Sequence, residues 1–307
     1  MNANSTYKAT SVLVTGASGF IGTHLCRHLN QQGAEITGTY LNHKPEGEHA
    51  KWICLDLTNQ EAVSHLIHTI QPTHIFHLAS HVQGQREIDT VLPTFENNLI
   101  STINILTAAQ QAGCCKRLVM TNSQEEPDQS NAIAIPSSPY AASKFAASAY
   151  ARMFHALYSL PIVIARVFMV YGPEQKDHRK LVPYTILKAL NGQTPELSSG
   201  QRNIDWVYVS DVVNGLSQLG CKTGLEGETI DLGSGQFHTV KEVVEKTLKQ
   251  IDPTIKGNFG AVADRAMEQE RLADAQKTNH KLNWRAQVTL EDGLTKTIEW
   301  YRTHNTN

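Results

Sequence analysis

A tyrosine and a lysine four positions apart, Tyr140 and Lys144 in "PSSPYAASKFAAS", could carry proton-transfer chemistry. Residues four apart on a helix share a face, so the lysine ammonium would lie beside the phenol. A nearby cation stabilises phenolate and lowers the pKa of tyrosine from its ordinary value of about 10 toward neutral pH. Such a phenol can donate or accept the proton that accompanies oxidation or reduction at a carbonyl.

The Tyr-x-x-x-Lys spacing occurs three times, so its context must single out one copy. The copy in "YLNHK" runs from a predicted strand into a loop, where residues four apart do not share a face. The copy in "YTILK" lies on a later predicted helix without a neighbouring acid or hydroxyl pattern. Tyr140 follows Pro139 in the first turn of an Ala-rich predicted helix. We interpret this copy as the catalytic pair, with Ser123 at the end of "RLVMTNS" placed to polarise a substrate carbonyl.

The second chemical pattern is a glycine triad, Gly16, Gly19 and Gly22 in "VLVTGASGFIGTHL". It lies between an apolar strand-like run and a helix expected over about 22 to 32. The first glycine permits a tight turn, the second lets backbone N–H groups approach a pyrophosphate, and the third lets the helix pack on the strand. Glycines also mark ordinary turns, but the strand before and the helix after favour a dinucleotide-binding loop.

The end of the second predicted strand bears on the choice of dinucleotide. An acidic residue there would accept a hydrogen bond from the ribose 2′-hydroxyl of NAD, whereas "ITGTYLNHK" offers Thr39 and Tyr40. Without a carboxylate, nothing repels a 2′-phosphate, and His43 or Lys44 could pair with one. The sequence therefore favours NADP over NAD. The alternative is that Tyr40 and His43 are only loop residues.

The elements that must position these groups alternate along the chain. Short β-branched runs and longer amphipathic segments follow one another through the first half, with helices expected over roughly 95 to 112 and from Pro139. This alternation predicts an α/β fold: a Rossmann-type doubly wound parallel sheet with a smaller, mostly helical C-terminal substrate-binding lobe. We assign residues 1–170 and about 204–235 to the Rossmann domain, and residues 171–203 and about 236–307 to the lobe.

Composition argues against several classes of function. The 307 residues include 27 Lys plus Arg and 29 Asp plus Glu, and a formal charge of −2 gives no electrostatic support for binding nucleic acid or an anionic membrane. The five cysteines lack paired metal spacing, so we expect reduced thiols and no metal site. A polar beginning and the lack of a long apolar run predict a cytoplasmic protein without a membrane segment.

Together these segments resemble the extended short-chain dehydrogenase/reductases that modify nucleotide sugars. The matching motifs run in order from about residue 11 to residue 304: "TGASGFIG", "CLDL", "HLAS", "ENNLISTINIL", "PYAASK", "ARVFMVYGPEQ", "DWVYVSDVV", "IDLGSG" and "LNWRAQVTLEDGLTKTIEWYR". By this resemblance Ser123, Tyr140 and Lys144 are the catalytic hydroxyl, the acid/base and the lysine that lowers its pKa. The resemblance implies these cofactor-binding residues: Gly16, Gly19, Phe20, Ile21, Gly22, Tyr40, Asp56, Leu57, Leu78, Ala79, Ser80, Asn98, Tyr140 and Lys144.

The resemblance also implies a nucleotide-sugar substrate and a homodimer. Arg202 and Arg265 resemble the arginines that clamp the substrate's diphosphate, a role that suits the bidentate guanidinium. A surface salt bridge is the alternative for either arginine. The homodimer would pack the helices near 95–112 and 140–158 as a four-helix bundle, and the alternative is a monomer that uses those faces internally.

The residues after Ser123 depart from the family pattern. Glu125 aligns with the glutamate that sugar-nucleotide 4,6-dehydratases use to remove the C5 proton, but Gln124 stands where glucose-type enzymes have an acidic proton donor. Mannose-type dehydratases manage without that acid, and some 4-keto reductases carry glutamate near this serine. Glu125 and Glu126 could also be solvated loop carboxylates. Met169 replaces an asparagine that touches the substrate in many relatives.

Family members share hydride transfer between nicotinamide C4 and sugar C4. The missing ribose carboxylate, the short chain and the incomplete dehydratase pattern favour NADPH-dependent reduction of an NDP-4-keto-6-deoxyhexose. The alternatives are an NDP-sugar C4 epimerase or 4,6-dehydratase with retained NAD. A non-catalytic dinucleotide sensor is a candidate of another class, which the intact Ser123, Tyr140 and Lys144 disfavour.

Overall fold

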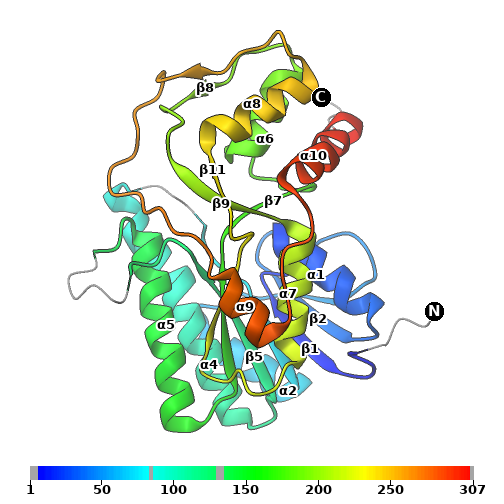
Figure 1. The fold of residues 1–307 in the computed structure, drawn as a ribbon. Helices are drawn as coiled ribbons and strands as arrows, with labels where there is room; N and C mark the ends of the chain where they lie inside the picture. The colour runs from blue at the N-terminus through cyan, green and yellow to red at the C-terminus, as the bar shows by residue number, and fades with distance from the viewer. Residues whose placement is uncertain (1–5, 83–85, 129–134, 305–307) are drawn as a thin grey trace. The chain divides into compact units, whose positions relative to one another are not determined.

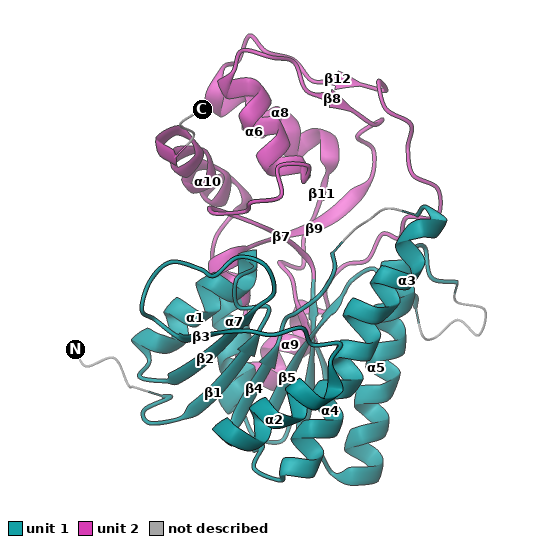
Figure 2. Cartoon of the chain, turned by 180° about the vertical axis from the view of Figure 1, so that it is seen from behind, with its two compact units in different colours: residues 1–167, 213–230 teal, residues 168–212, 231–307 magenta. Residues whose placement is uncertain are grey.

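The computed structural model describes residues 6–82, 86–128 and 135–304 (Figure 1). The chain forms two compact units (Figure 2). Unit 1 comprises the residues up to 167 together with 213–230, and unit 2 comprises 168–212 and the residues from 231 onward. The domain boundaries expected from the sequence remain a prediction.

A parallel sheet is the frame of unit 1, with seven strands among the described residues in the order β10-β6-β5-β4-β1-β2-β3. The register is parallel from β3 across to β6. The strands are β1 (Ser11–Thr15), β2 (Glu35–Tyr40), β3 (Lys51–Cys54), β4 (His74–His77), β5 (Arg117–Ser123), β6 (Ile162–Val167) and β10 (Thr229–Leu232). The strand order reverses between β1 and β4, which is where open α/β sheets bind ligands. The predicted Rossmann-type sheet is confirmed.

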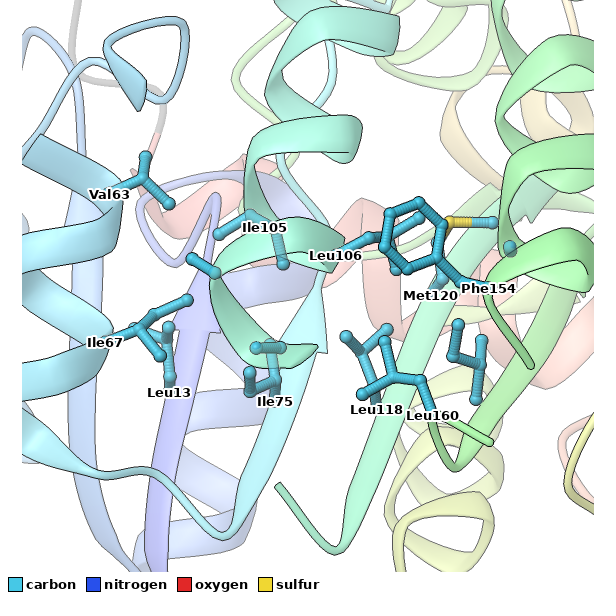
Figure 3. Close-up of a cluster of buried hydrophobic side chains, with 14 of the residues drawn as sticks. Leu13, Val63, Ile67, Ile75, Ile105, Leu106, Leu118, Met120, Phe154 and Leu160 are labelled. Carbon is cyan, nitrogen blue, oxygen red and sulfur yellow. The ribbon is translucent and has the colours of Figure 1, made fainter. Parts of the chain in front are cut away.

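Helices cover both faces of this sheet (Figures 1 and 2). They are α1 (Phe20–Gln31), α2 (Gln60–Ile70), η1 (Ile88–Thr90), α3 (Val91–Thr94), η2 (Phe95–Ile100), α4 (Ser101–Ala112), α5 (Pro139–Tyr158) and α7 (Val209–Cys221). Figure 3 shows the apolar core between the sheet and helices α2, α4 and α5, which includes Leu13, Val63, Ile67, Ile75, Ile105, Leu106, Leu118, Met120, Phe154 and Leu160. This core fixes the strand ends that carry the candidate site.

The helix expected over 95 to 112 differs from the one observed. Residues Phe95–Ile100 form a π-helical turn, and α4 begins only at Ser101. Asn98 lies within this turn, and its side chain bonds to groups outside the helix. Single π-helical turns occur frequently at functional sites.

Unit 2 contains two small sheets and four helices among the described residues. Its strands are β7 (Met169–Tyr171), β9 (Asn203–Tyr208) and β11 (Phe237–Thr239), in the order β11-β9-β7, and a separate pair, β8 (Glu196–Leu197) with β12 (Asn258–Phe259). Its own helices are α6 (Leu181–Leu190), α8 (Val240–Ile251), α9 (Ala275–Leu282) and α10 (Leu290–His304). Within the described ranges, none of the helices has the length and apolar character needed to cross a membrane.

Buried Asp205 on β9 ties distant segments of unit 2 together. Its carboxylate accepts hydrogen bonds from the N–H and hydroxyl of Ser234, at 2.6 and 2.7 Å, and from the N–H of Gly235 at 2.9 Å. It also accepts one from the N–H of Ala273 at 3.1 Å. Four donors satisfy a buried carboxylate, which would otherwise be costly to desolvate.

Candidate functional site

The glycine loop joins β1 to α1 at the point where the strand order reverses. Gly16 has φ of 65°, and a Cβ there would lie 2.6 Å from the backbone nitrogen of Ala79. A Cβ on Gly22 would lie 2.2 Å from the carbonyl oxygen of Gly16, so neither position admits a side chain. Gly19 is the N-cap of α1 and, among the described residues, no side chain caps it and no acid lies in the first turn. The helix therefore presents backbone N–H groups suited to an anion.

The loop after β4 faces the glycine loop and is held by Asn98. The Oδ1 of Asn98 accepts hydrogen bonds from the hydroxyl of Ser80 at 3.1 Å and from the N–H of His81 at 2.6 Å. Its Nδ2 donates to the hydroxyl of Ser143 on α5 at 3.0 Å. Asn98 thus joins three segments, and through them the structure brings Leu78, Ala79 and Ser80 close to both the glycine loop and α5.

A buried chain of hydrogen bonds links Thr102, His77 and Thr15, and the donor of each bond can be assigned. Thr102 donates its hydroxyl proton to the carbonyl of Asn98 at 2.6 Å, so it accepts from Nε2 of His77 at 2.9 Å. Nδ1 of His77 is then an acceptor for the hydroxyl of Thr15 at 2.7 Å, which accepts from the N–H of Ala79 at 3.3 Å. Burial, with a contribution from Lys144, lowers the pKa of His77 to about 3. The imidazole is therefore neutral, with its proton on Nε2.

The remaining predicted cofactor residues lie along the same edge of unit 1. Phe20 and Ile21 begin α1, and half-buried Tyr40 ends β2. Asp56 is exposed just after β3 and accepts hydrogen bonds from the N–H and hydroxyl of Thr58, whereas Leu57 is buried.

Tyr140, Lys144 and Ser123 gather where β5 ends and α5 begins. Ser138 caps α5 by accepting from the N–H of Ala141 at 3.1 Å, and Pro139 occupies the first turn, which sets Tyr140 at the start of the helix. The Nζ of Lys144 lies 5.8 Å from the centre of the Tyr140 ring and donates to the carbonyl of Thr121 at 3.1 Å. All three side chains are buried, and a side-chain hydrogen bond joins Ser123 to Tyr140.

The protonation of this pair differs from the sequence-based expectation. Burial, reinforced by the negative charge of Glu125, raises the pKa of Tyr140 above its ordinary value, while the hydrogen bond from Ser123 opposes the change. Burial also lowers the pKa of Lys144 to about 8. The expected lowering of the Tyr140 pKa by lysine is therefore not seen, because the loss of hydration dominates. The phenol stays protonated at neutral pH.

The segment after Ser123 contains three side chains in different settings. The N–H of Glu125 donates to the hydroxyl of Ser123 at 3.1 Å, and Glu125 is half-buried. Gln124 is buried. Glu126 is only 1% exposed, so the interpretation of this residue as a solvated loop carboxylate is wrong. The sequence offered no local periodicity from which the burial of Glu126 could be found.

Both predicted substrate arginines lie in unit 2 and share one carboxylate. Arg202 forms an ion pair with Glu268 at 3.0 Å and donates from Nη2 to the carbonyl of Gln269 at 3.0 Å. Arg265 lies 3.8 Å from the other oxygen of Glu268 and is mostly exposed. The guanidinium groups of Arg202 and Arg265 therefore lie close to the same carboxylate, that of Glu268.

Comparison with known proteins places this arrangement in a family. A model of the NAD dependent epimerase/dehydratase family matches residues 12–233. The chain belongs to this family. It is 29% identical to the dTDP-glucose 4,6-dehydratase of Shigella flexneri, covering 96% of this chain and 93% of the relative. It is 28% identical to the UDP-glucose 4-epimerase of Mycolicibacterium smegmatis, covering 94% and 98%.

A solved structure shares the fold over nearly the whole chain. The Bordetella bronchiseptica enzyme WbmF, in complex with NAD+ and UDP, matches with a TM-score of 0.85 and 26% identity, covering 98% of this chain and 94% of that one. The predicted membership in the extended short-chain dehydrogenase/reductases that modify nucleotide sugars is confirmed. The family's dependence on NAD supports a nicotinamide dinucleotide, and the preference for NADP remains a prediction.

Proposed function

We propose that this protein is a nucleotide-sugar oxidoreductase that transfers hydride at sugar C4, with Tyr140 as the proton carrier. One observation carries the proposal: Tyr140, Ser123 and Lys144 meet in a buried cluster beside the edge of the sheet where the glycine loop lies. A buried phenol next to a hydroxyl and an ammonium is suited to acid/base catalysis at a carbonyl or secondary alcohol.

The residues of unit 1 fit a dinucleotide. Gly16 and Gly22 leave no volume for side chains at the amino end of α1, and the uncapped N–H groups after Gly19 would hold the pyrophosphate. Tyr40, Asp56 and Leu57 would line the adenosine end, while the loop of Leu78, Ala79 and Ser80 with Asn98 would lie against the phosphates and the second ribose. When bound, a nicotinamide dinucleotide would supply or accept the hydride.

Residues of this protein would then transfer the proton that accompanies the hydride. In the direction of reduction, Tyr140 donates its proton to the C4 oxygen of the substrate, and Ser123 hydrogen-bonds to that same oxygen. Lys144, cationic below a pKa of about 8, stabilises the phenolate that remains. Burial of the cluster excludes bulk water and strengthens these interactions.

Reduction of an NDP-4-keto-6-deoxyhexose is the specific reaction we propose. The raised pKa of Tyr140 keeps the phenol protonated, as a proton donor to a carbonyl must be. Gln124 cannot supply the proton that loss of a C6 hydroxyl requires, which disfavours dehydration of glucose-type substrates. Tyr40 at the end of β2 carries no charge to repel a ribose 2′-phosphate, which favours NADPH. Arg202 and Arg265 would bind the diphosphate of the sugar nucleotide.

A C4 epimerase with retained NAD is the second candidate. The matched family model is NAD-dependent, and relatives over nearly the full length carry the names epimerase and dehydratase. An epimerase returns the hydride to its own substrate, so it keeps the dinucleotide bound between turnovers. A reductase must exchange it.

Identification of the bound dinucleotide separates these candidates. Purified protein is denatured, the released dinucleotide is identified, and NADPH oxidation is followed with a panel of NDP-4-keto-6-deoxyhexoses. Reductase activity predicts turnover with the panel and little retained NAD, whereas stoichiometric NAD contradicts it. Tyr140→Phe should abolish turnover, and Tyr184→Phe, in another Tyr-x-x-x-Lys copy, is the matched control.

We also propose that the protein is a homodimer, as the resemblance implied. Figure 2 shows α3 and α5 as neighbouring segments of unit 1. Apolar side chains are exposed along η1, α3 and η2, where they are Ile88, Leu92 and Phe95, and at the end of α5, where they are Leu157 and Tyr158. Exposed apolar patches of this kind are typical of protein interfaces.

Analytical ultracentrifugation tests the homodimer. Leu157→Glu should convert a dimer into a monomer, because a charge in an apolar interface has no partner. Val262→Glu in unit 2, also at an exposed apolar position, is the control and should leave the dimer intact. A monomeric wild-type protein at micromolar concentration contradicts the proposal.

A further inference from the structure

Glu126 is a buried carboxylate that the reaction described above does not use. It is 1% exposed and lies three residues after Ser123, whose carbonyl accepts its N–H at 3.2 Å. The hydroxyl of Ser148 lies 3.1 Å from each of its two carboxylate oxygens. A carboxylate withdrawn from water to this degree needs a compensating partner.

The partners of Glu126 are cationic and lie on two other elements. Arg166 on β6 and Lys144 on α5 both attract its negative charge, and both oppose the rise in its pKa that burial causes. Ser148, which binds the carboxylate, is one helical turn beyond Lys144 on α5. Asn122 on β5 donates to the carbonyl of Lys144 at 3.0 Å and also to the hydroxyl of Ser148, so the helix segment and the carboxylate are fixed to the same strand.

Because the attraction between two charges is mutual, the Glu126 carboxylate also affects the ionisation of Lys144. Burial alone drives Lys144 toward its neutral form, and Glu126 is the anion that opposes this effect. The ammonium donates to the carbonyl of Thr121, a neutral acceptor that cannot replace a charge. The charge of Lys144 also acts on His77 on β4, but His77 is neutral. Glu125, on the same loop as Glu126, acts on Tyr140.

We propose that Glu126 is a positioning residue whose carboxylate keeps Lys144 cationic and thereby sets the pH range in which the Tyr140–Lys144 pair works. The inference rests on the proposed function, because it assigns a role to Glu126 through that pair. Glu126 acts through Lys144, and none of its contacts described above is to a reacting atom.

The direction of the effect follows from the sign of the charge. A buried carboxylate raises the pKa of every neighbouring group, and it acts in this direction on both Lys144 and Tyr140. Replacing Glu126 by the neutral, similarly shaped glutamine should therefore move both limbs of the pH profile to lower pH. A neighbouring charge can shift a pKa by roughly one to three units, so we expect a displacement of about one pH unit.

The test compares the full-length wild type with Glu126→Gln, Glu126→Asp and Glu61→Gln. The pH profile of kcat/KM should shift to lower pH in Glu126→Gln and return close to that of the wild type in Glu126→Asp. Glu61 is exposed on α2, so Glu61→Gln removes the same charge from the surface and should leave the profile unchanged. A lower kcat with an unshifted profile overturns the proposal, since a merely structural role would have that result.

A second readout does not depend on turnover. The ionisation of Lys144 is followed by NMR of protein labelled with ¹³C at lysine Cε, with Lys144→Arg identifying the resonance. The titration should move to lower pH in Glu126→Gln, and an unmoved titration overturns the proposal even if no substrate is turned over. Absence of activity with a shifted titration would instead count against the proposed function alone.

Ser148→Ala keeps the inference testable if Glu126→Gln does not fold. Without the Ser148 hydroxyl, Glu126 loses a donor that favours its charged form, so Lys144 should titrate at lower pH by a smaller amount. An unchanged Lys144 titration in Ser148→Ala, with the fold intact, contradicts the proposed coupling.

Discussion

Protonation of His77 should set part of the acid sensitivity of unit 1. His77 lies in the directional chain between Thr15 and Thr102, and its pKa is lowered to about 3. In the unfolded protein, histidine has a pKa of about 6.5. The pKa of His77 is lower in the folded than in the unfolded protein, so the unfolded state binds the proton more readily. The contribution of His77 to the free energy of unfolding is therefore complete above pH ~6.5 and is lost as pH falls. The linkage relation gives a loss of about 1.4 kcal/mol between pH 7.5 and pH 5.5.

The assay for His77 is urea unfolding followed by circular dichroism at these two pH values, for the wild type and for His77→Asn. Asparagine cannot take up the proton, so the variant should lose about 1.4 kcal/mol less stability than the wild type over the interval. His28 and His74, whose pKa values burial also lowers, remain in both proteins and cancel. Equal losses in the two proteins would refute the assignment of a neutral, network-bound His77.

Three substitutions test other parts of the structure. Gly22→Ala places a Cβ 2.2 Å from the carbonyl oxygen of Gly16, so we expect a loss of more than ~2 kcal/mol in urea unfolding and no binding of added dinucleotide by calorimetry. Dinucleotide binding equal to that of the wild type would contradict the tight packing of the loop. Arg202→Lys loses the planar guanidinium and should weaken UDP binding about tenfold by calorimetry, or ~1.4 kcal/mol, with unchanged dinucleotide binding. Equal UDP affinity would remove Arg202 from the diphosphate site. Asp205→Asn places an amide beside donors that need an acceptor, so we expect the free energy of unfolding in urea to fall by about 3 kcal/mol. A change below ~1 kcal/mol would show that the four bonds do not hold unit 2 together.

The parts of the site that follow from local pattern could be predicted from the sequence. The glycine loop is one example, because the requirements for a turn, a close approach and helix packing fall at fixed spacing. The position of Tyr140 in the first turn of α5 is another, since Pro139 and the serine before it specify where the helix begins. The parallel sheet followed from the alternation of strand-like and helix-like segments.

The features that depend on distant contacts could not be predicted. The π-helical turn around Asn98 depends on bonds to the loop after β4 and to α5, whereas its sequence reads as the start of an ordinary helix. The burial of Glu126 depends on Arg166 and Ser148, which are far away along the chain. The direction of the Tyr140 pKa was missed for the same reason, because the loss of hydration is a property of the folded core. His77, which follows two apolar residues at the end of the strand-like run "HIFH", was an available signal of a buried polar network.

Hydride transfer to sugar C4 is the central claim, and isotope transfer tests it most directly. The protein is incubated with an NDP-4-keto-6-deoxyhexose and the reduced nicotinamide dinucleotide carrying deuterium at both C4 positions, and the product is analysed by NMR. We predict deuterium at sugar C4 with the wild type and none with Tyr140→Phe. Product without deuterium at C4, or equal labelling by the Tyr140→Phe variant, would contradict the role assigned to this phenol.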